Sequence, residues 1–85
     1  MSRPVYNVVV QTVWPDGFKS EVRGDAITTT RKTLEALRRA GVSYDQSVPV
    51  ALRDTTQRVA VRSTPDATIT AGLATLNVRC AKEGV

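Results

Sequence analysis

Residues 5–23 of the chain read VYNVVVQTVWPDGFKSEVR and decide the fold class. Residues 5–13 are rich in β-branched side chains and place Tyr6, Val8 and Val10 on one face, and residues 18–23 alternate with charged side chains at every second position. A period of two predicts half-buried strands. Between them, Pro15 presets φ and Gly17 accepts the left-handed conformation, which predicts a tight turn. The segment is therefore expected to form a β-hairpin. The side chains assigned to its core face are Tyr6, Val8, Val10, Trp14 and Phe18.

Outward from this hairpin, residues 28–40 are expected to form a helix. Asp25 and the threonines of 28–30 offer oxygen atoms for its N-cap, and Gly41 ends it. A rotation of about 100° per residue predicts one packed side and an adjoining basic side. The packed side comprises Ile27, Thr30, Leu34, Leu37 and Ala40.

The basic side of this helix is a candidate contact surface. Its cations are Arg31, Lys32, Arg38 and Arg39. Glu35 lies among them and is expected to pair with Arg31 and Arg39 at a spacing of four residues. A solvated helix face is the competing interpretation.

Residues 48–53 and 57–63 are expected to form a second hairpin around a loop over 54–57. This register aligns the apolar side chains of both strands on one face. Pro49 cannot donate to a strand ladder, so it is expected either on an edge strand or at the start of its strand. The other face would carry the cations Arg53, Arg58 and Arg62, which could bind phosphates or an acidic protein patch.

The last third of the chain allows two interpretations. Strict alternation predicts a strand over 73–80, whereas apolar spacing over 66–82 also fits a helix. The resulting fold is a single α+β domain over 1–85, with one helix packed on one face of a small antiparallel sheet. The element order is ββαβββ, with ββαββα as the alternative.

The composition excludes most catalytic chemistry. The chain has no histidine and one cysteine, Cys80, which rules out histidine-assisted nucleophiles, an intrachain disulfide and a zinc site. The glycines form no phosphate-binding loop. We therefore expect no enzyme activity, no metal and no cofactor, and we expect Cys80 to pack in the core.

Cellular context is also expected from the sequence. The lone cysteine and the lack of a long apolar segment predict a cytoplasmic protein without a membrane span.

Charge and the remaining surface residues leave three hypotheses. Twelve Lys and Arg stand against eight Asp and Glu, giving a net charge of +4. The first hypothesis is a protein-binding inhibitor or adaptor that docks on an acidic, possibly nucleoprotein, surface through the arginines and Trp14. Small anti-defence proteins of phages and mobile elements exemplify this class, by base rate alone.

The second hypothesis is a nucleic-acid-binding protein, although the aromatic residues are expected to lie apart from the arginine-rich hairpin. The third is a self-assembling subunit, in which edge strands near Pro49 and the C-terminus pair in a homodimer.

Overall fold

The structure is a computed structural model that describes residues 7–81, and it begins with the expected hairpin. β1 (Asn7–Val13) pairs antiparallel with β2 (Lys19–Gly24). In the connection, Gly17 has a φ of +91°, and the Asp16 carboxylate accepts the Phe18 N–H at 3.0 Å. Turn chemistry therefore sets this hairpin as the sequence predicts.

The expected helix is α1 (Ala26–Arg39), and its N-cap is Asp25. The Asp25 carboxylate accepts the Thr28 N–H at 2.7 Å, and this hydrogen bond holds the pKa of the carboxyl below its usual value of 3.8. The helix starts two residues earlier than expected because Asp25, and not the threonine run, caps it. At the other end, Gly41 takes a φ of +75°.

The predicted second hairpin is wrong, because this segment is α2 (Ser47–Ala60). Its buried residues are Val48, Leu52, Thr56 and Val59. These positions fall on one helical stripe, which the period-two interpretation overlooked. Pro49 is the third residue of the helix, where its missing N–H breaks no helical hydrogen bond.

The last third forms a strand hairpin and not a helix. β3 (Ala67–Ala71) pairs antiparallel with β4 (Ala74–Ala81), which confirms the strand expected over 73–80. The sequence analysis missed β3. Gly72 begins the two-residue connection with a φ of +61°, a conformation that favours glycine.

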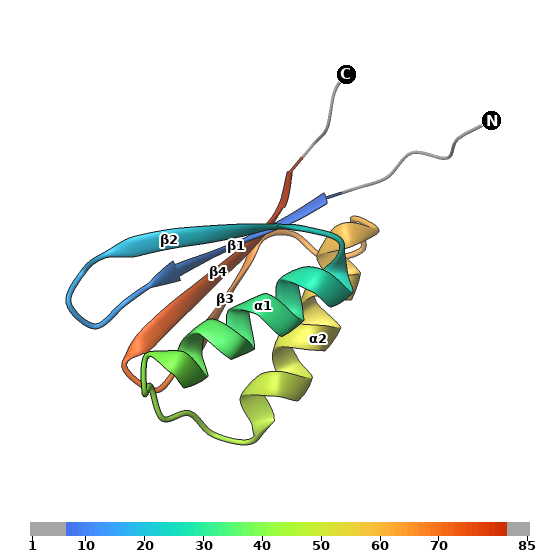
Figure 1. Cartoon of the computed structure of the whole chain (residues 1–85). Helices are drawn as coiled ribbons and strands as arrows, with labels where there is room; N and C mark the ends of the chain where they lie inside the picture. The colour runs from blue at the N-terminus through green and yellow to red at the C-terminus, as the bar shows by residue number, and fades with distance from the viewer. Residues whose placement is uncertain (1–6, 82–85) are drawn as a thin grey trace.

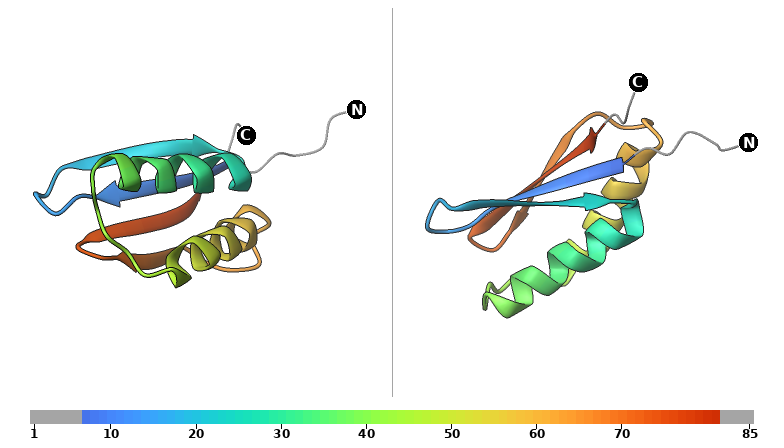
Figure 2. Two further views of the ribbon diagram at one scale, coloured as in Figure 1. Left: turned by 60° about the horizontal axis from the view of Figure 1, so that its bottom comes forward. Right: turned by 45° about the horizontal axis from the view of Figure 1, so that its top comes forward.

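The four strands form one antiparallel sheet in the order β2-β1-β4-β3. Both helices lie on the same face, α1 over β2 and β1, α2 over β4 and β3 (Figures 1 and 2). The expected α+β class with an antiparallel sheet is confirmed, whereas the order over residues 7–81 is ββααββ, with two helices in this range instead of one. The edges are β2 and β3, so the edge strands expected near Pro49 and the C-terminus are wrong.

The core lies between the sheet and the helix layer. Its fully or nearly fully buried residues are Val8, Val10, Leu37, Val48, Leu52, Val59, Ala71, Ala74, Leu76 and Val78. Trp14 and Cys80 are half-buried and pack against this cluster, as expected. Three residues expected to be buried are exposed instead: Phe18 at 66%, Ile27 at 69%, and Ala40, which follows the last residue of α1. Tyr6 lies outside the described residues.

Helix geometry explains why Ile27 leaves the core. Thr29, Thr33 and Leu37 are buried and follow one another at a spacing of four residues, so they define the side of α1 that faces the sheet. Ile27 lies about a third of a turn away from this line, on the flank that faces α2.

Candidate binding surfaces

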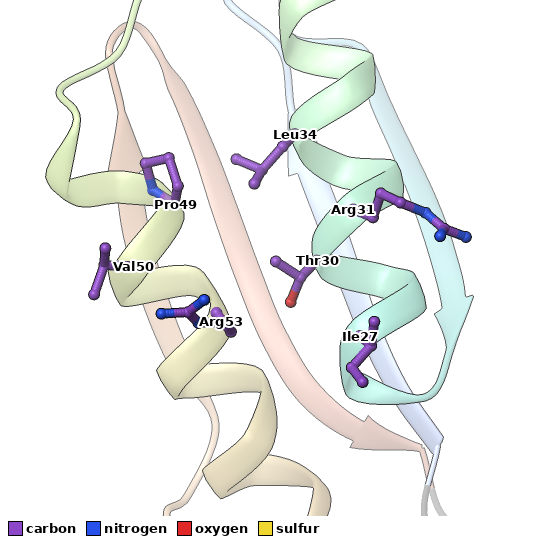
Figure 3. A pocket seen from close by; sticks show the side chains of 7 residues that line it. All are labelled: Ile27, Thr30, Arg31, Leu34, Pro49, Val50 and Arg53. Atoms are coloured by element: carbon purple, nitrogen blue, oxygen red, sulfur yellow. The ribbon is translucent and has the colours of Figure 1, made fainter.

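A groove of about 320 Å³ runs between α1 and α2 on the side of the helices away from the sheet. It is lined by Ile27, Thr30, Arg31, Leu34, Pro49, Val50 and Arg53. Thr30 and Leu34 point from α1 towards α2 and form the floor with Pro49 (Figure 3). The groove is therefore largely apolar, although two arginines stand beside it.

Hydrogen bonds within and between the two helices satisfy the hydroxyl groups at the groove floor. The Thr30 hydroxyl donates to the Ala26 carbonyl at 2.7 Å, and it lies 2.8 Å from the Thr56 hydroxyl. The Thr56 hydroxyl also reaches the Arg53 carbonyl at 3.0 Å. Because these hydroxyls already have partners, an apolar group can cover the floor without leaving a polar atom unpaired.

The rims of the groove carry exposed apolar and cationic side chains. Ile27 is 69% and Val50 is 59% exposed, which is unusual for branched aliphatic residues. Arg31 extends from the outer side of α1, and Arg53 lies on α2 (Figure 3). Neither arginine forms an ion pair within residues 7–81, although Arg31 is close enough to help lower the pKa of Asp25.

A second hollow, of about 510 Å³, lies where the first hairpin meets α1. Trp14 lines it together with Lys32 and Arg39. The indole N–H donates to the Ser20 hydroxyl at 3.0 Å, which fixes the ring. Trp14 also borders a neighbouring hollow of about 540 Å³ that contains the exposed Phe18. The structure thus places aromatic and basic side chains together, which the sequence analysis did not expect.

The predicted basic strip of α1 divides into two parts. Arg31 and Arg38 are seven residues apart and share the flank nearer α2, whereas Lys32 and Arg39 share the flank nearer the hairpin. Glu35 lies between the two pairs, and it makes no ion pair among the described residues, so the expected pairing with Arg31 and Arg39 is wrong.

The predicted arginine face of the second hairpin does not exist. Arg53 and Arg58 lie on α2, five residues and therefore about 140° apart, on different sides of the helix. Asp54 also belongs to α2, and not to the loop expected over 54–57. It pairs with Arg58 at 3.1 Å. Arg62 follows the helix with a φ of +61°. Of these three arginines, only Arg53 lines the groove.

The face of the sheet away from the helices carries mostly polar side chains that pair with one another around the buried Val9. Glu21 of β2 reaches Arg79 of β4 at 3.2 Å and Arg23 at 3.9 Å. The Asn77 side-chain N–H donates to the side-chain amide oxygen of Gln11 at 3.2 Å, and the Asn77 Oδ1 accepts from the Thr68 hydroxyl at 3.0 Å. Arg23 and Arg79 therefore share the one carboxylate of Glu21, whereas Arg31 and Arg53 of the helix layer form no ion pair within residues 7–81.

The exposure of Ile27 and of Val50 beside the groove was not predicted from the sequence, for the same reason in both cases. Ile27 and Val50 were assigned to buried faces, since apolar residues are expected inside. Only the packing of α1 against α2 shows that they border a groove. The helical stripe of α2, spaced by four, four and three residues, was the signal that could have located Val50 on an outer face.

Within residues 7–81, no helix is long and apolar enough to cross a membrane, and no three metal-ligating side chains gather in one place. Comparison of the chain with protein-family models, curated proteins and solved structures gives no match.

Proposed function

We propose that this protein is a non-catalytic binding module that receives an apolar, acid-flanked helix of another protein in the groove between α1 and α2. The observation that carries the proposal is the groove itself, with Ile27 and Val50 exposed on its rims. Exposed apolar groups beside a concave apolar surface favour a protein contact.

The position of the groove between two packed helices supports a third helix as the occupant. A third helix has a diameter of about 10 Å with its side chains, so its apolar stripe would cover the floor while its flanks reach both rims. The rims carry Arg31 and Arg53, so acidic side chains on those flanks complete the match. A second copy fits this groove poorly, because a symmetric contact would bring the rim arginines of both copies together.

Site-specific photo-crosslinking in lysate of the native host tests the proposal. The crosslinking amino acid replaces Val50 in the groove or, as the control, Val61 just beyond α2, which is similarly exposed at 68% against 59%. We expect one discrete protein adduct from position 50 that survives nuclease treatment. Equal adducts from both positions, or an adduct lost with nuclease, would contradict the proposal.

Charge reversal identifies the chemistry of the partner. The double variant Arg31→Glu/Arg53→Glu should lose the adduct from position 50, because it would oppose acidic flanks with like charge. The control Arg58→Glu removes a cation that already pairs with Asp54 and should keep the adduct. A partner retained by the double variant and lost by the control would refute the assignment to the groove.

A second candidate function is binding of single-stranded nucleic acid, which the hollow beside Trp14 favours. Bases stack on aromatic rings while nearby cations contact phosphates, and here Lys32 and Arg39 line the same hollow as the indole. Since Trp14 is the one tryptophan of the chain, its fluorescence reports on this site alone.

Titration with oligothymidylate tests this second candidate. We expect quenching of Trp14 fluorescence at low salt, an affinity that falls as salt is added, and loss of quenching in Lys32→Glu/Arg39→Glu. Arg58→Glu again serves as the control. Unchanged fluorescence at low salt would rule out this function.

A further inference from the structure

The two edges of the sheet differ in how they discourage contact with another strand. β2 carries the charged residues Lys19, Glu21 and Arg23 at alternate positions. Charged side chains on an edge strand hinder pairing with a further strand. β3 has the sequence ATITA and carries no charge. Edge protection is therefore present on one side of the sheet and missing on the other.

The register of β3 shows which backbone groups face outward. Ala71 pairs with Ala74 across the two-residue connection, and the turn bond from one to the other makes them a hydrogen-bonded pair. Because such pairs alternate, Ala67, Ile69 and Ala71 direct their backbone groups to β4. The N–H and C=O groups of Thr68 and Thr70 consequently point away from the sheet.

We propose that two copies of the protein pair through β3 about a two-fold axis at Ile69, so that their four-stranded sheets join into one continuous sheet. In this register Thr68 of each copy opposes Thr70 of the other. Each such pair exchanges both of its backbone hydrogen bonds, so every outward group of the two threonines is satisfied.

Side chains at this edge are self-complementary. Threonine would face threonine on the open side of the sheet, and cross-strand pairs of β-branched residues stabilise a sheet. On the helix side Ile69, now half-buried, would face its own counterpart. The flank of α2 nearest this edge carries the small residue Ala51, and the ion-paired Asp54 and Arg58 leave it without net charge.

Engineered cysteines in the full-length Cys80→Ser protein test the register. Ile69→Cys would place two thiols opposite each other, with Cα atoms about 4.5 Å apart, within the range of a disulfide. Thr70→Cys is the matched control, since its two copies lie on a diagonal beyond disulfide reach. We expect a disulfide-linked dimer from Ile69→Cys and none from Thr70→Cys. Equal crosslinking of both variants, or none from Ile69→Cys, overturns the proposal.

Sedimentation measures the same interface without a covalent bond. The parent protein should sediment as a dimer, and Thr70→Pro should sediment as a monomer, because proline removes an outward N–H while sparing the ladder to β4. Circular dichroism shows whether the proline variant is folded, and Thr68→Pro provides a second variant of the same kind. A parent protein that sediments as a monomer, or folded proline variants that remain dimeric, would also overturn the proposed pairing through β3.

Discussion

Gly72 joins two parts of the molecule that are distant in sequence. The connection between β3 and β4 lies against the segment that links the helices, because a Cβ atom on Gly72 would collide with the carbonyl oxygen of Ser43. The residue also has a φ of +61°. Its lack of a side chain thus serves both the turn and the contact that fixes the start of α2 against the sheet.

We expect Gly72→Ala to destabilise the fold more than Gly17→Ala. Both glycines have positive φ, and an L-residue there costs about 1–2 kcal/mol. A Cβ on Gly17 meets nothing within 4 Å, so only the Gly72 variant adds a collision with backbone. Urea unfolding measures the free energy of unfolding of each variant. Equal decreases in the free energy of unfolding would show that the backbone at Ser43 moves aside and that the collision costs little.

At the scale of the element, α2 is the segment whose secondary structure was predicted wrongly from the sequence. Its β-branched residues favour strands, and its apolar positions fit both a period of two and a helical stripe. Packing decides between them, because Leu52 and Val59 reach the core only from a helix lying on β4 and β3. The sequence carries only a modest signal for the start of α2, which is Asp45: its carboxylate accepts the Ser47 N–H at 2.8 Å.

A proline substitution at Gln57 tests whether residues 47–60 form the observed helix or the hairpin predicted from the sequence. Gln57 is exposed in the last third of α2, so Gln57→Pro should lower the free energy of unfolding by about 3 kcal/mol or more through a lost hydrogen bond and a clash with the preceding turn. In a hairpin it would end a loop, where proline costs little. Gln57→Ala is the control, and equal thermal midpoints for the two variants would contradict the helix.

Elements with local signals were predictable, and elements defined by distant contacts were not. The hairpin of β1 and β2 and the cap of α1 follow from Gly17 and Asp25, each acting within a few residues. The candidate groove does not, because it exists only where α1 meets α2. Arg31 and Arg53 could be named as candidates from the sequence, but the fact that they line one groove could not be predicted from it.

At the scale of the molecule, the distribution of charge depends on the sheet register. The sequence fixes a net charge of +4 but not which cations are neutralised. Glu21 and Arg79 are 58 residues apart and meet because β2 and β4 flank β1. Arg23 and Arg79 share the charge of Glu21 on the open face of the sheet, whereas Arg31 and Arg53, which line the groove between α1 and α2, form no ion pair within residues 7–81.

The proposed dimer would keep these surfaces available. Pairing through β3 extends the sheet sideways, while the side chains that line the groove lie between the helices, in front of the sheet in Figure 3. A dimer would therefore present two grooves, and a partner with two acidic helices would bind with an effective concentration that a monomer lacks.

The pairing of β1 with β4 governs how the chain can fold. Asn7 lies opposite Ala81, so the centre of the sheet unites the first and last described strands. Each hairpin can form by itself, but the core closes only after nearly the whole chain is available, and such distant pairing slows folding. A rearranged chain that leads from residue 81 through a short turn into residue 7, and is opened elsewhere, would make this central pairing local. It would reach the same fold sooner.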